Sequence, residues 1–190
     1  GHQDFGGFEL HYNDVALFCD LGRRSYDSSG AGDPSSEMHN TLLVNGVGSF
    51  PVNKPYYNDK FREQITGAKP SISCSIDKII LKSDAYSRLK NVGTWEREWA
   101  FSDKRITLTD RIDGTGRHKI DRFLHSTLPF YGEENGFRIG SVKVFVDGEI
   151  KHRPSKRWFS YGRSEPATSI SITANVNLPW SSSITMEIGA

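Results

Sequence analysis

The sequence has little cysteine, no long apolar run and no recognisable leader segment, and each absence narrows what the chain can be. Its 190 residues include two cysteines, Cys19 and Cys74, which leave one disulfide or two separate thiols equally open. No apolar stretch approaches the ~20 residues that a membrane-spanning helix needs, so no membrane span is expected. A signal peptide is also missing, but the opening GHQDFGGFEL suggests a motif whose first part precedes the chain.

A strong excess of charge is absent as well. The formal net charge is +1, from 24 basic and 23 acidic side chains. The total charge therefore gives no indication of a nucleic-acid or membrane partner, and we expect no nucleic acid. The densest basic cluster is KHRPSKRW at residues 151–158. We interpret it as a solvated loop, with a contact to an anionic polymer as the alternative.

Sustained helical periodicity is the third absence, and only residues 58–67 are compatible with a short helix. Short apolar or alternating segments recur instead, separated by polar connections such as DGTGR, GEENG and VDGE. This pattern predicts one all-β domain over residues 1–190, an antiparallel two-sheet β-sandwich of about ten or more strands. The expected strands lie at 6–13, 15–20, 41–46, 71–83, 95–102, 105–114, 118–128, 141–150, 168–176 and 182–190.

Three side chains suited to a metal occur within the first forty residues: His2, Asp20 and His39. Imidazole nitrogen and carboxylate oxygen are zinc ligands, and their wide spacing suits ligands from the ends of successive strands. Asp20 ends an apolar run, where a carboxylate needs a cation or hydrogen bonds. The structural alternatives are a salt bridge from Asp20 to Arg23 or Arg24 and a hydrogen-bonding role for His39 beside a strand.

The residues GHQDFGGFELHYNDVALFCDLGRRSYD, followed by EMHNTLLVNG, resemble the carboxy-terminal domain of the heparinase II/III-like polysaccharide lyases. In that family a His-x-His-x-Asp element precedes a strand, an Asp-x-Gly element with a following tyrosine, and a His-Asn-Thr strand. Here these elements fall on His2 and Asp4, on residues 20–22 with Tyr26, and on residues 39–41. The segment from Trp95 to Phe130 resembles later strands of the family, so the resemblance covers most of the first 130 residues.

The resemblance implies that His2, Asp20 and His39 bind a structural Zn²⁺ ion that organises the site. It also implies an acidic polysaccharide substrate, such as a heparin-like polymer or alginate, and a bacterial enzyme that is periplasmic or secreted. Such lyases act by β-elimination: a base removes the proton next to the uronate carboxylate, and an acid protonates the departing glycosidic oxygen.

In the family, most of the base and acid groups lie on a helical toroid that precedes the β domain. The first histidine of His-x-His would fall one position before Gly1, and no helical region is evident. We therefore expect the chain to be part of a longer enzyme, with an N-terminal helical toroid as its missing partner domain. A stand-alone β protein descended from such an enzyme is the alternative. The isolated chain is expected to be inactive.

Candidate substrate contacts follow the Asp-x-Gly element. Arg23 and Arg24 can pair with uronate carboxylates or sulfates through two-pronged hydrogen bonds, and the hydroxyl of Tyr26 can face the same cleft. Tyr26 is also a weak catalytic candidate, and the sequence assigns no other catalytic residue. The structural alternatives are surface charge for the arginines, including a pair with Asp27, and a loop anchor for the tyrosine.

Three functions compete. The first is the β-sandwich portion of a polysaccharide lyase that cleaves uronate-containing glycans, contributing a metal site and a wall of the cleft. The second is a non-catalytic carbohydrate-binding or structural β-sandwich with a structural metal. The third is a free-standing metal-dependent hydrolase, which would need Asp4 or Glu37 as its general base.

Overall fold

A computed structural model describes residues 4–23, 36–51, 58–65, 70–160 and 162–189. Within them the chain forms twelve β-strands, the helix α1 (Asp59–Ile65) and the 3₁₀ turn η1 (Ser36–Met38). The strands are β1 (Leu10–Tyr12), β2 (Val15–Phe18), β3 (Leu42–Val44), β4 (Ser71–Cys74), β5 (Lys78–Ser83), β6 (Val92–Ser102), β7 (Arg105–Ser126), β8 (Phe130–Glu133), β9 (Gly136–Ile139), β10 (Val142–Val146), β11 (Glu149–Ser160) and β12 (Arg163–Ile188).

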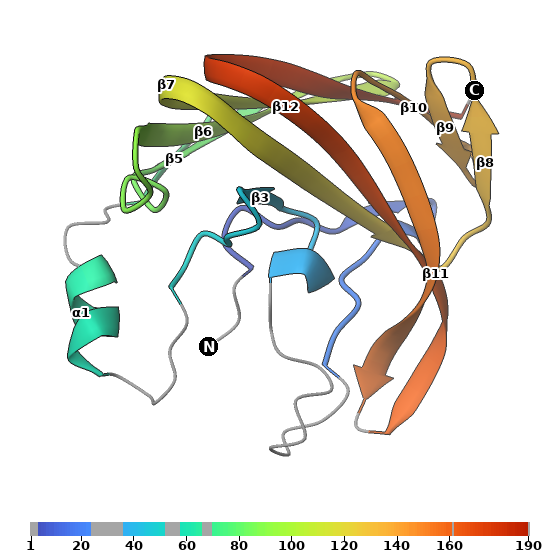
Figure 1. Cartoon of the computed structure of the whole chain (residues 1–190). Coiled ribbons are helices and arrows are strands. Elements are labelled where there is room, and N and C mark those ends of the chain that lie inside the picture. Colours follow the sequence, from blue (N-terminus) through green and yellow to red (C-terminus); the bar gives the residue numbers. More distant parts are fainter. Residues whose placement is uncertain (1–3, 24–35, 52–57, 66–69, 161, 190) are drawn as a thin grey trace.

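Two long strands, β7 and β12, run antiparallel side by side and organise a ten-stranded sheet. The first half of β7 pairs with β6 and its second half with β3. Likewise, the first half of β12 pairs with β11 and its last residues pair with β10. The hairpin β1–β2 forms a separate two-stranded sheet. Figure 1 shows the long strands of the large sheet arching over the short strand β3, η1 and the N-terminal segments, so these short pieces lie on the concave side of the arch.

Apolar side chains fill the space under the arch in two clusters. One gathers around Phe18, Leu124 and Phe137, between the β1–β2 hairpin and the C-terminal strands. The other gathers around Trp95 and Ile120 and includes residues of β3 and β6. Burial of these large side chains is the main favourable contribution to the fold. The N-terminal segments thus help to close the core, which fixes their positions relative to the sheet.

The predicted all-β antiparallel fold is confirmed, and α1 lies within the predicted short helical segment. The arrangement is consistent with a β-sandwich. Several predicted boundaries are wrong: residues 151–158, interpreted as a loop, lie in β11, and the single strand expected at 71–83 is divided into β4 and β5. The DGTGR connection lies inside β7, so the two strands expected at 105–114 and 118–128 are one. The structural reason is that Gly114 and Gly116 have φ values of 136° and 83°, which let the strand bend without breaking. The expected strands at 168–176 and 182–190 are likewise joined in β12.

The two cysteines do not pair. Cys19 is buried and Cys74 is exposed on the edge strand β4, and both are thiols. Burial raises the pKa of Cys19, which lowers the reactivity of its thiol. Within the described residues no helix is long and apolar enough to span a membrane.

Candidate functional site

Asp20 and His39 are in direct contact. His39 Nδ1 lies 2.8 Å from Asp20 Oδ2, with the two side chains 4% and 34% exposed, respectively. The residues are far apart in sequence and are brought together from the end of β2 and the end of η1. A hydrogen bond of this kind fixes the orientation of the imidazole ring and the position of its proton. The structure therefore brings together two of the three residues that the sequence predicts as metal ligands.

The Asp20 segment is held by backbone hydrogen bonds on both sides. Cys19 N donates to His125 O at 3.0 Å, and Leu21 N donates to Met38 O at 3.1 Å. Trp158 N, from β11, donates to Leu21 O at 2.7 Å, and Gly22 forms a parallel bridge with Trp158. Asp20 thus lies in a short stretch that is held by backbone hydrogen bonds to β7, η1 and β11.

The His39 segment is held as firmly. His39 N donates to Ser36 O at 3.2 Å, which closes the 3₁₀ turn. The next residue, Asn40, is fully buried, and its side chain bonds two segments at once. Asn40 Nδ2 donates to Phe8 O at 2.7 Å, and Asn40 Oδ1 accepts from His125 N at 2.8 Å. The histidine is therefore fixed relative to both the N-terminal segment and β7.

A second histidine, His125 on β7, lies beside the Asp20–His39 pair. Its side chain is fully buried, and neither ring nitrogen has a hydrogen-bond partner within the described residues. Burial lowers the pKa of His125 to about 4, and the negative charge of Asp20 opposes this effect only in part. The ring stacks on Phe123, with 6.4 Å between the ring centroids. His125 is thus a neutral aromatic wall of the site at ordinary pH.

Asp20 has a feature that suits a cation. Although part of its side chain is exposed, its Oδ1 atom is buried and accepts no hydrogen bond within the described residues. A buried carboxylate oxygen needs a cation or a donor, and the site has the mixed nitrogen and oxygen donors that zinc accepts. Within the described residues, no three His, Cys, Asp or Glu side chains are arranged to hold a metal ion. Asp20 and His39 therefore fit a metal as a partial ligand set.

The remaining predicted site residues divide into two groups. His2, Arg24 and Tyr26 lie outside the described residues. Arg23 is described, is partly buried, and follows the Gly22 bridge directly. Asp4 is exposed, and its carbonyl accepts from Gly7 N at 2.8 Å, so its backbone closes a turn. The metal and substrate roles of these residues stay predictions.

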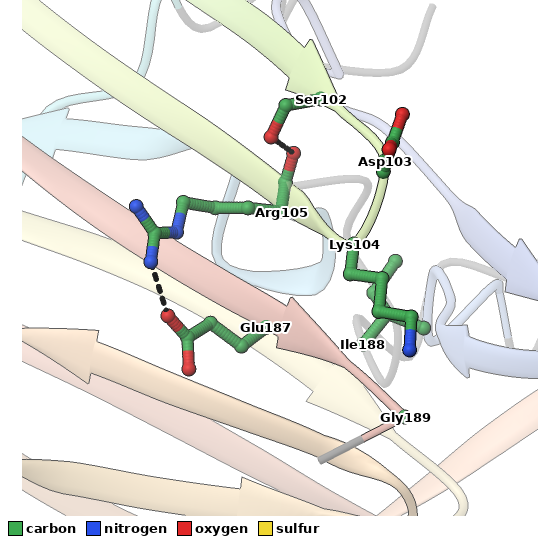
Figure 2. A pocket seen from close by; sticks show the side chains of 7 residues that line it. All are labelled: Ser102, Asp103, Lys104, Arg105, Glu187, Ile188 and Gly189. Atoms are coloured by element: carbon green, nitrogen blue, oxygen red, sulfur yellow. Dashed lines mark hydrogen bonds and ion pairs between the residues drawn. The ribbon is translucent and has the colours of Figure 1, made fainter.

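A surface depression of about 570 Å³ lies at the β6–β7 turn, and neither Asp20 nor His39 lines it. Figure 2 shows that it is lined by the turn and by the end of β12, and that the side chains of Arg105 and Glu187, on neighbouring strands, point toward each other. The Arg105 Nη2 atom lies 2.6 Å from Glu187 Oε1, so these exposed charges satisfy each other. The Ser102 hydroxyl in its lining donates to Arg105 O at 3.3 Å, and no histidine or cysteine is among the described residues that line the depression, so we assign it no chemistry.

Residues 1–181 match the model of a protein family that is described as heparinase II/III-like, C-terminal. The chain belongs to this family. The match confirms the resemblance found in the sequence and extends it well beyond the first 130 residues. No curated protein matches the chain.

Solved structures with a similar fold include heparinase III and a heparan sulfate lyase. A heparinase III gene product superposes with a TM-score of 0.71 at 16% identity, over 98% of this chain and 30% of the other. The heparan sulfate lyase HepC from Pedobacter heparinus gives 0.70 at 15% identity, over 100% and 31%. A further heparinase III gives 0.62 at 18% identity, over 100% and 30%. The chain thus spans about 30% of the length of these enzymes.

Sequence reasoning about this family member missed the residues that support the site. In the sequence, Asn40 is evident only as part of the His-Asn-Thr element, and no local pattern links His125 to Asp20. The buried Arg97–Asp110 pair was not anticipated. Asp110 did carry a signal, because it shares one strand face with Leu108 and Ile112, and a carboxylate in an apolar row needs a buried cationic partner.

Proposed function

We propose that this chain is the β-domain of a polysaccharide lyase that cleaves uronate-containing acidic glycans by β-elimination. In this proposal the domain contributes a structural metal site and one wall of the cleft. A helical segment of the same enzyme supplies the base and the acid. The family match over residues 1–181 supports the lyase assignment, and the printed activity of one structural neighbour, a heparan sulfate lyase, supports an acidic glycan as the substrate class.

The observation that carries the metal site is the partly buried contact between His39 Nδ1 and Asp20 Oδ2 at 2.8 Å. With His2, these residues would supply two imidazole nitrogens and one carboxylate, which is a zinc ligand set that leaves a fourth position. Bound zinc would cross-link the segments that hold its ligands and would not generate a nucleophile. The chain's own contribution is to hold the ligands in place, because Asn40 and Leu21 fix the backbone beside each of them.

The substrate wall is proposed to lie beside Asp20. Arg23 follows Gly22, whose backbone is pinned to Trp158 of β11, so the arginine starts from a fixed backbone position. A guanidinium there can pair with a uronate carboxylate in the two-pronged geometry that arginine favours. Such a contact would hold the sugar while the proton next to the carboxylate is removed. Arg24 and Tyr26, which lie outside the described residues, remain proposed contacts, and a periplasmic or secreted location remains proposed.

The test is a lyase assay of this chain and of the full-length enzyme, combined with a zinc determination on both. Formation of the unsaturated uronate is followed by ultraviolet absorbance on heparan-type glycans and alginate. We expect activity from the long enzyme only, one zinc per chain in both, and loss of zinc in His39→Ala. The exposed His11→Ala is the matched control and should keep its zinc. Activity of the isolated chain would contradict the proposal that a helical segment supplies the base and the acid. Zinc binding without lyase activity in the long protein would favour a carbohydrate-binding or structural domain.

A further inference from the structure

Arg97 is an arginine that the fold buries almost completely. It lies on β6, its side chain is 1% exposed, and it faces Asp110 directly across the β6–β7 ladder. Arg97 Nε donates to Asp110 Oδ1 at 2.7 Å and Arg97 Nη2 to Asp110 Oδ2 at 3.0 Å. The rings of Trp95 and Trp99 cover the guanidinium, with its carbon 5.2 and 5.9 Å from their centroids. This two-pronged pair fixes the orientation of the guanidinium.

The remaining nitrogen of the guanidinium reaches two other chain segments. Arg97 Nη1 donates to Gly6 O at 2.7 Å and to Asn40 O at 3.1 Å. Gly6 belongs to the segment that continues from His2, and Asn40 directly follows His39. One buried cation therefore joins the backbone segments that lead to two proposed zinc ligands.

Thr41 makes a second connection between the same segments. Its side chain is 1% exposed, and Thr41 Oγ1 donates to Phe5 O at 2.9 Å. Phe5 and Gly6 are neighbours, so Arg97 and Thr41 hold successive carbonyls of the N-terminal segment. This explains a part of the His-Asn-Thr element that the proposed metal site does not use directly.

We propose that Arg97 and Thr41 are positioning residues, which hold the segments of His2 and His39 in register so that both can bind one metal ion. The inference rests on the proposed zinc site. It goes beyond that site because it assigns a role to two residues that never touch the ion. A purely structural role would affect folding stability but would not change the affinity or geometry of the metal in the folded protein.

The choice of arginine supports this role. A lysine at position 97 would keep the charge opposite Asp110 but would offer one ammonium group in place of a planar fork. It could not bond both oxygens of Asp110 and still reach Gly6 O and Asn40 O in the same geometry. Arg97→Lys is therefore a charge-conserving variant that removes positioning. Thr41→Val keeps the side-chain shape and removes one hydrogen bond.

The experiment measures zinc affinity and the visible spectrum of the Co²⁺-substituted protein for wild type, Arg97→Lys and Thr41→Val. Two matched controls have side chains on the opposite face of β7 from Asp110: Arg111→Lys, from a partly buried pair with Glu96, and Thr109→Val, from a hydrogen bond to Ser183. Circular dichroism establishes the folded fraction of each metal-free variant. If Arg97→Lys does not fold, the milder Thr41→Val decides the question.

We expect zinc affinity to fall about three- to tenfold in Thr41→Val, by more in Arg97→Lys, and by less than twofold in the controls. The cobalt spectrum should change in Thr41→Val and Arg97→Lys but not in the two controls. Affinity and spectrum equal to those of the controls would overturn the positioning role while leaving the zinc site standing. Absence of zinc binding in the wild type would overturn both, and that result is visible before any variant is compared.

Discussion

His125 illustrates at the residue scale how burial alone can link stability to pH. Its pKa in the folded chain is about 4, against an ordinary 6.5, chiefly because the buried ring cannot be hydrated when it is charged. Between pH 6.5 and about 4, the imidazole of His125 is therefore protonated in the unfolded chain but neutral in the folded chain. The stability from this group is present above pH 6.5 and is lost as the pH falls to about 4.

We expect the metal-free protein to lose about 3 kcal/mol of unfolding free energy through His125 across this pH window. His125→Phe removes the titration and keeps an aromatic ring beside Phe123, so its stability should change less over the same range. Urea unfolding in the presence of a chelator measures both. His11→Phe, at an exposed position, is the control and should follow the wild type. Equal pH dependence of His125→Phe and wild type would contradict the assignment.

At the scale of elements, the bridge between Gly22 and β11 depends on the absence of a side chain. Gly22 has a φ of 69°, and an added Cβ would lie 2.1 Å from Trp158 O. Gly162 has a nearly equal φ of 71° with no atom within 4 Å of an added Cβ. Alanine at either position carries a similar backbone strain, so the difference between the two variants isolates the contact with β11.

We expect Gly22→Ala to destabilise the fold by about 1–3 kcal/mol more than Gly162→Ala, because the Asp20 segment must move away from β11. Urea unfolding of the two variants gives the difference. Equal unfolding free energies would contradict this expectation, because they would show that the Gly22–Trp158 bridge accommodates the added Cβ with no loss of stability.

The elements were predictable to the extent that local pattern determines them. The run VALFCD predicts a strand; β2 covers Val15–Phe18 of it, and Leu17, Phe18 and Cys19 are buried while Val15 is exposed. The continuity of β7 was not predictable, because glycines in a polar stretch usually mark a turn and here permit a bend. The contacts of Arg97 depend on the register that sets it opposite Asp110, and no local pattern specifies that register.

For the whole molecule, the proposed zinc site predicts a stability that depends on metal. An ion that binds only the folded chain should raise the unfolding free energy by about 2.7 kcal/mol when zinc is present at a hundredfold excess over its dissociation constant. Thermal or urea unfolding with and without zinc measures the increase. In His39→Ala the increase should vanish, whatever the effect of the substitution on the metal-free protein. An undiminished increase in that variant would place the ion elsewhere.

The pairing of β7 with β12 also determines when the molecule can form. Its register joins Ser126 to Thr168 at one end and Arg105 to Glu187 at the other, so the central ladder is made entirely of contacts between distant parts of the chain. Folds dominated by such non-local pairings fold slowly, in about milliseconds to seconds, because loop-closure entropy is lost before the contacts form. During synthesis the core cannot close until β12 has left the ribosome. The earlier strands, with their apolar faces uncovered, must wait for it, and this interval is when the nascent chain is most exposed to aggregation.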